Sequence, residues 1–262
     1  MPQPRGILFD MDGVLYVGEQ VVPGAIETLR WCRAQGIPFL FLTNTSSRPR
    51  AALVEKLARL GIEARESEIL TPPVAAQAWL AEHVDGPIAL FVPEATTREF
   101  QGLPIAAHDA ATAAAVVVGD LGEGWDHATL NAAFRLLMTE PPATLVALGL
   151  TRYWQAPDGL RLDVGPYVKA LEYAAGCEAV VLGKPAAPFF RAALDALGLP
   201  AASVIMIGDD IRGDVAAAQA VRIRGLLVRT GKFRPADLEG DIRPDAVLDS
   251  IAALPTWWQK NA

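Results

Sequence analysis

Two carboxylates near the start of the chain are spaced so that they could share a cation. The apolar run Ile7 to Phe9 ends in Asp10, and Asp12 follows two residues later, ahead of Gly13. A short buried strand that ends at an acid places that acid at the carboxyl end of the strand, where open α/β sheets bind their ligands. Because residues two apart in an extended segment point to the same side, Asp10 and Asp12 can converge. Such a pair repels unless a cation or a proton lies between the two groups, so it predicts a divalent metal site.

Polar side chains also follow three later apolar runs. Carboxyl ends of parallel strands meet at one edge of a sheet, so we expect all four strand ends to lie together. The three runs are Pro38 to Leu42, followed by Thr43 and Asn44; Ala179 to Leu182, followed by Gly183, Lys184 and Pro185; and Val204 to Ile207, followed by Gly208, Asp209 and Asp210, with Asp214 further on.

Transfer of a phosphoryl group would use each of these side chains. Asp10 fits the nucleophile that forms an aspartyl-phosphate, and Asp12 fits the general acid that then becomes the base for water. Thr43 with the amide behind it, or Asn44, could hold a phosphoryl oxygen. Lys184 would supply a fixed positive charge that keeps Asp10 ionised beside the phosphate.

The acids also predict an all-oxygen Mg²⁺ site. A carboxylate oxygen of Asp10, the backbone carbonyl of Asp12 and a carboxylate oxygen of Asp209 are ligands of the kind that Mg²⁺ prefers. Asp210 and Asp214 are expected to lie in the shell behind these ligands. Each of these acids alone would more often be a turn or a helix start, and the functional interpretation depends on their common order and placement.

The elements that must position these residues alternate between short apolar runs and amphipathic stretches. This alternation is typical of a doubly wound, mostly parallel sheet with helices on both faces. The strands expected outside the middle of the chain are 7–9, 38–42, 179–182, 204–207, 223–228 and 245–248, with a connection at 69–73. Between them, the expected strands are 88–92, 115–119 and 144–148, the expected helices are 74–83, 126–138 and 164–175, and a hairpin is expected at 152–162.

No strand expected in the middle of the chain ends in an acidic or hydroxyl cluster. We therefore predict an inserted α/β cap domain at 74–176 and a discontinuous core domain made of 1–73 and 177–262. Tyr153 and Trp154 lie in the expected hairpin, and we hypothesise that they shape the substrate pocket.

Composition narrows the class of protein. The chain has 262 residues, of which 52% are apolar, and a net charge of −7, which argues against a nucleic-acid surface. No apolar stretch reaches the length of a membrane span, and the two cysteines, Cys32 and Cys177, have no metal-ligand spacing. We expect a soluble cytoplasmic protein whose partner is a small phosphorylated substrate, without nucleic acid or membrane.

Four ordered motifs resemble those of the haloacid dehalogenase-like phosphatases. They are ILFDMDGVLY at 7–16, LTN at 42–44, GKP at 183–185 and GDDIRGD at 208–214. The insertion between the second and third motifs is where the subfamily with a large α/β cap carries its cap. The resemblance implies Mg²⁺ at Asp10, Asp12 and Asp209, a phosphate site made of Asp10, Met11, Asp12, Thr43, Asn44 and Lys184, and a homodimer formed through the cap.

Segments 162–176, 181–190, 206–219 and 229–235 resemble members that act on pyrophosphate, phosphohistidine or phospholysine. Those members can have serine at the position of Asp12. With Asp12 present, a proton can be transferred to an ester leaving group, so the alternative is a broad phosphomonoesterase acting on sugar or nucleotide phosphates. A phosphoryl-accepting signalling receiver is the alternative of another class, but receivers lack an insertion of about a hundred residues, and Asp12 implies turnover.

Overall fold

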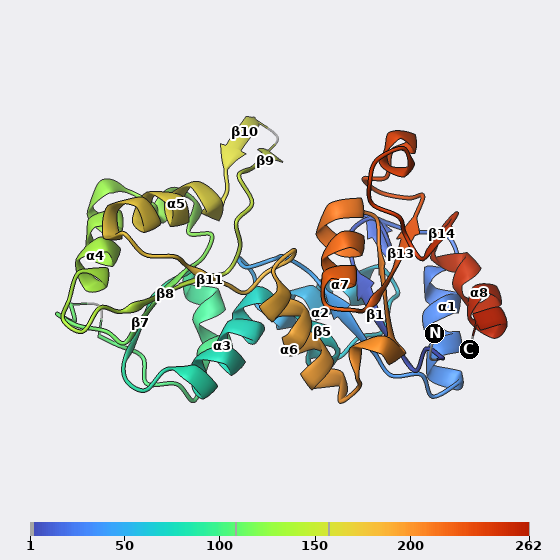
Figure 1. Ribbon diagram of the computed structural model, residues 1–262, viewed down its shortest axis with the longest axis horizontal. Helices are drawn as coiled ribbons and strands as arrows, with labels where there is room; N and C mark the ends of the chain where they lie inside the picture. Colours follow the sequence, from blue (N-terminus) through green and yellow to red (C-terminus); the bar gives the residue numbers. More distant parts are fainter. Residues whose placement is uncertain (1–2, 108, 157, 262) are drawn as a thin grey trace. The chain divides into compact units, whose positions relative to one another are not determined.

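The computed structural model describes residues 3–107, 109–156 and 158–261, which form two compact units. The first unit consists of Met1–Thr43, Arg50–Leu70 and Lys184–Ala262, and the second of Asn44–Pro49 and Thr71–Gly183. Each unit is built on a parallel sheet with helices packed against it, so the predicted α/β class is confirmed (Figure 1). The predicted insertion at 74–176 lies inside the second unit, which also includes 44–49, 71–73 and 177–183, segments that were expected in the core domain.

The first unit contains a six-stranded sheet in the order β14-β13-β12-β1-β4-β5, with every neighbouring pair parallel. β1 lies in the middle of this order because its residues Gly6–Asp10 are all buried, as a strand covered on both faces requires. Its neighbours are β4 and β12, so the end of β1 lies between the ends of two other strands. The remaining strands are β4 Phe39–Leu42, β5 Ile69–Leu70, β12 Val204–Gly208, β13 Arg224–Val228 and β14 Ala246–Leu248.

Aromatic rings pack the core under this sheet. The ring of Phe9 lies 5.7 Å from that of Phe39, which lies 5.3 Å from that of Phe41. On the same unit, helices α1 and α8 lie side by side (Figure 1), joined by an edge contact between Trp31 and Trp258. The helices are α1 Ala25–Ala34, α2 Arg50–Arg59, α6 Ala187–Leu197, α7 Ala217–Ala220 and α8 Leu254–Asn261, with a small hairpin of β2 Tyr16–Val17 and β3 Gln20–Val21. Short helical turns are η1 Glu66–Glu68, η4 Ala201–Ser203, η5 Ile211–Ala216, η6 Pro235–Leu238 and η7 Ile251–Ala253.

The second unit contains a four-stranded parallel sheet in the order β11-β8-β7-β6. Two of its helices, α4 and α5, lie side by side in Figure 1. Each begins at an aspartate that accepts a backbone N–H, at 2.7 Å for Asp126 and 2.6 Å for Asp163, which satisfies donors at the helix start. The elements are α3 Pro72–His83, β6 Ile88–Phe91, η2 Glu94–Phe100, β7 Ala115–Val118, η3 Gly122–Gly124, α4 His127–Leu137, β8 Thr144–Ala147, α5 Val164–Ala175 and β11 Val180–Val181.

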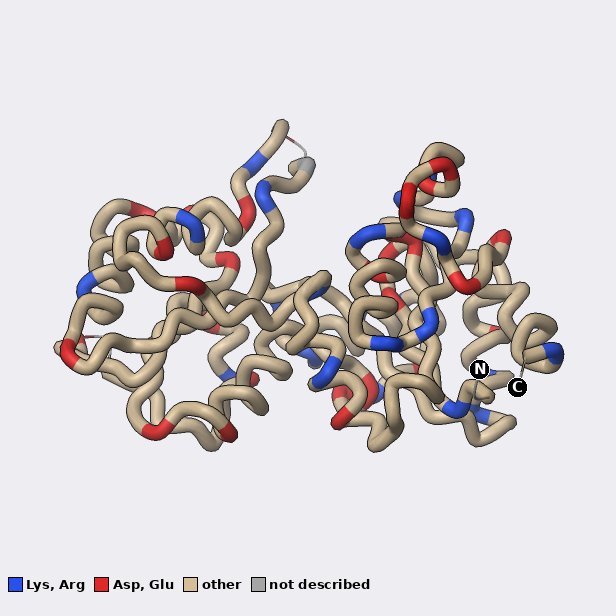
Figure 2. Tube along the Cα trace, in the orientation of Figure 1, with Lys and Arg blue, Asp and Glu red and all other residues tan. Residues whose placement is uncertain are grey.

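Acidic and basic residues are interspersed along the backbone of both units (Figure 2). Among the residues that the structure describes, no helix combines the length and the apolar composition that crossing a lipid bilayer would need.

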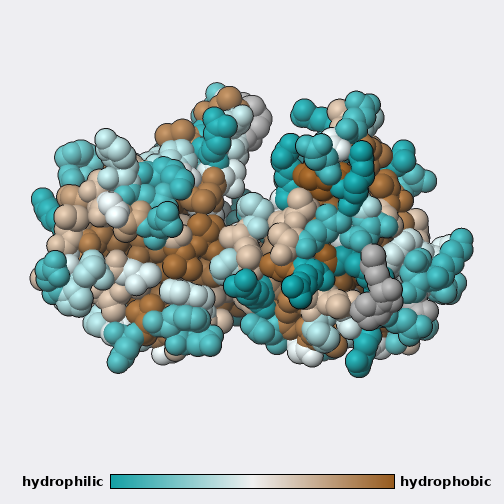
Figure 3. All heavy atoms as spheres, in the orientation of Figure 1, coloured by the Kyte–Doolittle hydropathy of each residue, from teal (hydrophilic) through white to brown (hydrophobic). Residues whose placement is uncertain are grey.

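The predicted hairpin is confirmed as β9 Tyr153–Ala156 and β10 Gly159–Leu162, which pair antiparallel. Pro157, in the expected turn, lies outside the described residues. Tyr153, Trp154, Leu160 and Leu162 are all exposed, and apolar atoms are visible at this hairpin in Figure 3. The hairpin therefore presents apolar side chains at the surface of the second unit.

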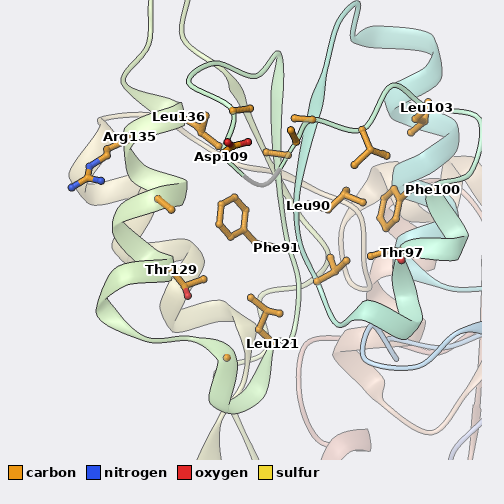
Figure 4. A pocket seen from close by; sticks show the side chains of 18 of the residues that line it. Leu90, Phe91, Thr97, Phe100, Leu103, Asp109, Leu121, Thr129, Arg135 and Leu136 are labelled. Atoms are coloured by element: carbon orange, nitrogen blue, oxygen red, sulfur yellow. The ribbon is translucent and has the colours of Figure 1, made fainter.

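A cavity of about 1120 Å³ lies within the second unit, beside the edge strand β6 (Figure 4). Its lining is largely apolar and includes Leu90, Phe91, Phe100 and Leu136. None of the lining residues is one of the side chains that the sequence predicts to be catalytic.

Two strand predictions are wrong. The run 179–182 was expected in the core sheet, but β11 pairs with β8 in the four-stranded sheet of the second unit. The segment 69–73 was expected to be a connection, but β5 pairs with β4 at the edge of the six-stranded sheet, and α3 already begins at Pro72. Both strands have only two residues, so partners distant in the sequence decide where they pair.

Candidate active site

Three adjacent strands of the first unit position polar side chains at one edge of the six-stranded sheet. Asp10 is the last residue of β1 and pairs in register with Leu42, the last residue of β4. Thr43 follows β4 directly, and Asp209 follows β12 directly. Since β1 lies between β4 and β12, these three residues emerge side by side, as the sequence predicts.

Lys184 links two buried carboxylates. Its Nζ donates to Oδ1 of Asp10 and to Oδ1 of Asp214, the latter at 2.7 Å, and all three side chains are buried. Burial alone would lower the pKa of Lys184, but attraction to the two carboxylates outweighs burial and raises it. The ammonium therefore stays charged and fixed beside Asp10. The sequence predicted that Lys184 would follow a strand of the core sheet, but the strand before it belongs to the sheet of the second unit.

The two carboxylate oxygens of Asp209 differ in their hydrogen bonding within the described residues. Its Oδ2 accepts the backbone N–H of Lys232 at 2.7 Å. Its Oδ1 is buried and has no hydrogen-bond partner in the described part of the chain. A buried carboxylate oxygen without a donor is costly unless a bound species satisfies it.

Asp10, Asp209 and Asp214 form a buried acidic cluster in which one oxygen from each lies within 4.8 Å of the others. Burial raises the pKa of all three carboxyls, to about 6 for Asp209 and Asp214, and their mutual repulsion adds to the rise. A divalent cation among the three would relieve this repulsion and satisfy Oδ1 of Asp209. Carboxylate oxygens are hard ligands, so the residues present fit Mg²⁺.

The other predicted acids take different places. Asp12 is exposed and is not part of the acidic cluster, whereas Asp214, expected behind the ligands, belongs to it. Asp210 accepts the backbone N–H groups of Arg212 at 2.9 Å and Gly213 at 2.8 Å, so it caps the turn that carries Asp214.

The residues predicted to bind phosphate divide similarly. Thr43 lies at the end of β4, partly buried, and its backbone N–H donates to the carbonyl of Leu70 at 3.3 Å. Asn44 is exposed and is counted with the second unit. The side chain of Met11 is buried in the hydrophobic core, so only its backbone could serve a phosphate.

Sequence reasoning did not assign a role to the loop that follows β13. Thr230 Oγ1 donates to the carbonyl of Gly13, and the N–H of Lys232 donates to Asp209, as described above. The signal was present in the sequence, because the polar residues Thr230 and Lys232 come shortly after the predicted strand 223–228, just as polar residues follow the strands that carry the predicted site.

This arrangement can bring a nucleophile to a phosphorus atom. A buried carboxylate at Asp10 lies beside a fixed ammonium and a group of acids suited to a cation. The ammonium, together with a cation held by the acids, would offset the negative charge of a phosphoryl group. The exposed carboxyl of Asp12 is two residues from Asp10 and accessible for proton transfer.

Comparison with known proteins agrees with this chemistry. Residues 7–105 match the family model of haloacid dehalogenase-like hydrolases, and residues 181–254 match a HAD-hydrolase-like model. Phospholysine phosphohistidine inorganic pyrophosphate phosphatase of Homo sapiens is 40% identical over 253 residues, which cover 95% of this chain and 92% of that protein. Haloacid dehalogenase-like hydrolase domain-containing protein 2 of Bos taurus is 39% identical over 244 residues, 93% of this chain and 91% of that protein.

Solved structures of similar proteins share the fold over nearly the whole chain. A p-nitrophenyl phosphatase from Archaeoglobus fulgidus, 29% identical, has a TM-score of 0.86 and covers 98% of this chain and 100% of its own. A hypothetical protein from Pyrococcus horikoshii, also 29% identical, has a TM-score of 0.88 and covers 96% of this chain and 98% of its own.

Proposed function

Because this chain belongs to the haloacid dehalogenase-like hydrolase family and is a phosphatase, we propose that it hydrolyses a small phosphorylated substrate with Mg²⁺ through an aspartyl-phosphate on Asp10. The observation that carries this proposal is the pairing of buried Asp10 with Lys184 inside the acidic cluster. We assign the second unit as the cap, and a homodimer stays a prediction that light scattering on the purified protein would check.

In the first step, a carboxylate oxygen of Asp10 attacks phosphorus, and the bond from phosphorus to the leaving group breaks. Lys184, held by Asp10 and Asp214, keeps a positive charge next to the attacking oxygen and the phosphoryl group. Asp12 gives its proton to the leaving oxygen or nitrogen, so that this atom departs without an added negative charge.

In the second step, Asp12, now a carboxylate, takes a proton from water, and the resulting hydroxide attacks phosphorus. The bond from phosphorus to Asp10 breaks, which releases inorganic phosphate and restores both carboxyls to their starting forms. An exposed position suits Asp12 to both proton transfers, because its carboxyl can reach a leaving group and water.

Mg²⁺ would be held by Asp10 and Asp209, with the backbone carbonyl of Asp12 as the third protein ligand and Asp214 close by. When bound, it offsets the charge of the phosphoryl oxygens. Asp214 would remain paired with Lys184 and thereby fix the ammonium.

We infer that the substrate is either pyrophosphate or a phosphoramidate such as phosphohistidine or phospholysine. The support is the 40% identity over 95% of the chain to a protein named for those substrates. The second candidate is a broad phosphomonoesterase, which Asp12 and the similarity to a p-nitrophenyl phosphatase favour. A panel of pyrophosphate, phosphoramidate, sugar phosphates and nucleotide monophosphates, with and without Mg²⁺, separates the two.

The role of Asp12 can be tested by replacing Asp12 with Asn and comparing leaving groups. p-Nitrophenolate leaves without a proton, whereas an alkoxide needs one, so kcat/KM should fall by about 10²-fold or more for a sugar phosphate and much less for p-nitrophenyl phosphate. Equal losses on both substrates would show that Asp12 is not the acid.

A further inference from the structure

We propose that the loop Thr230 to Lys232 is a positioning element for the metal ligand Asp209. It holds Oδ2 of that carboxylate, so that Oδ1 is left for Mg²⁺. The inference rests on the proposed function, because it assumes that the acidic cluster binds the metal.

The carboxylate of Asp209 lies between two glycines. A Cβ added at Gly13 would lie 1.9 Å from Oδ2 of Asp209, and a Cβ added at Gly231 would lie 2.0 Å from it. Both glycines have positive φ, 86° and 62°, which side-chain-bearing residues rarely adopt. The close approach of these two backbones therefore requires glycine on both sides of the carboxylate.

The two glycine loops are also joined to each other. The hydroxyl of Thr230 donates to the carbonyl of Gly13, and a Cβ at Gly231 would lie 2.5 Å from the Cα of Gly13. The loop after β13 is thus fixed to the loop that carries Asp12, which connects the position of Asp209 to that of the predicted nucleophile and acid.

The two carboxylate oxygens of Asp209 therefore have different roles. Oδ2 accepts the N–H of Lys232 at 2.7 Å, whereas Oδ1 is buried without a partner in the described residues. A hydrogen bond behind a metal ligand fixes its orientation, and loss of such a bond typically weakens metal affinity about 10–100-fold. We expect this loop to lower the entropy that Asp209 loses when Mg²⁺ binds.

The test compares two glycine substitutions with the same backbone requirement. Gly36 has a φ of 64°, like Gly231, but a Cβ there would meet no atom within 4 Å. Gly231→Ala should therefore displace the carboxylate of Asp209 and raise the Kd of Mg²⁺ at least about 10-fold. Gly36→Ala, which carries the same backbone strain, should keep the wild-type Kd. The Kd is measured by calorimetric titration of Mg²⁺ into the enzyme without substrate.

A second pair of variants keeps the proposal testable if Gly231→Ala does not fold. Thr230→Val removes the hydroxyl and keeps the branched shape, and it should raise the Kd of Mg²⁺ several-fold, to roughly 3–10 times wild type. Thr230→Ser keeps the hydroxyl and should restore the wild-type value. A purely structural role for the hydroxyl of Thr230 would lower the Tm of Thr230→Val without changing its Kd, and would contradict the positioning role.

Asp209→Asn separates this inference from the proposed function. If Asp209→Asn loses Mg²⁺ binding but folded Gly231→Ala and Thr230→Val bind it like wild type, the positioning role is wrong and the metal site stands. If wild type does not bind Mg²⁺, or if Asp209→Asn binds it equally well, the proposed function itself is wrong.

Discussion

Replacing Lys184 by Met tests whether the buried charges of the site balance each other. Met has nearly the length of Lys but no ammonium, so Lys184→Met leaves Asp10 and Asp214 buried without their shared donor. Both carboxylates are nearly inaccessible, at 6% and 1% exposure, so water cannot replace the lost ammonium.

The expected cost follows from this burial. Removing one partner of a buried ion pair destabilises a protein by about 3–5 kcal/mol, because the remaining charge is left uncompensated. Breaking an exposed ion pair costs at most about 1 kcal/mol, so the size of the loss in the free energy of unfolding distinguishes a buried pair from an exposed one.

The cost should also depend on pH. The pKa of Asp214 is about 6 in the folded protein against an ordinary value of 3.8, so folding binds protons and the free energy of unfolding decreases as pH rises between these values. The ammonium of Lys184 holds this pKa down, so Lys184→Met raises it further and extends the decrease to higher pH. The free energy of unfolding of Lys184→Met should therefore fall furthest below that of the wild type near pH 8, and less far below it near pH 5.

The measurement is urea unfolding without Mg²⁺ at pH 5 and pH 8, with Lys260→Met as the control. Lys260 is exposed on α8, so its loss should change the free energy of unfolding by no more than about 0.5 kcal/mol. A deficit for Lys184→Met below about 1 kcal/mol at pH 8, or one that is the same at both pH values, would refute the reasoning.

Three further predictions concern the nucleophile, the metal and the core. Asp10→Asn keeps the size of the side chain and removes the nucleophile, so phosphatase turnover should be lost while circular dichroism stays unchanged; retention of most activity would refute the assignment. Mg²⁺ should raise the Tm more at pH 7.5 than at pH 5, because protons on Asp209 and Asp214, with pKa values of about 6, compete with the cation; equal Tm shifts would argue against this cluster as the site. Phe9→Ala should lower the free energy of unfolding by about 3–5 kcal/mol, because the ring is fully buried against Phe41; a loss below about 1 kcal/mol in urea unfolding would contradict the packing.

The sequence predicted the strand ends at the site well because their pattern is local. The buried run before Asp10 and the run before Asp209 are continuous apolar segments that stop at an acid, and such segments form the central strands of a parallel sheet. Because these strands pair in parallel, their carboxyl ends lie at the same edge of the sheet.

Sheet membership was harder to predict. Val180–Val181 and Ile69–Leu70 are apolar pairs of similar composition, yet the first pairs with β8 in the second unit and the second pairs with β4 in the first. The partners lie far away in the sequence, and no local periodicity distinguishes the two cases. Lys184 was nevertheless placed beside Asp10 by its motif, although the strand before it belongs to the other sheet.

The environment of Asp209 could not be predicted, because it arises from tertiary packing. Gly13 and Gly231 are more than two hundred residues apart, and only the folded chain shows that both contact one carboxylate. In the sequence, each is an ordinary glycine that follows a predicted strand by a few residues.

The most direct test of the proposed mechanism is to trap the covalent intermediate. Enzyme mixed with a turning-over substrate is quenched within milliseconds and treated with borohydride, which reduces an aspartyl-phosphate to homoserine, and the modified residue is located by mass spectrometry of the peptides. We predict homoserine at Asp10 in the wild type and none in Asp10→Asn. Active enzyme that never yields homoserine at this position, or that yields it at another aspartate, would contradict the account.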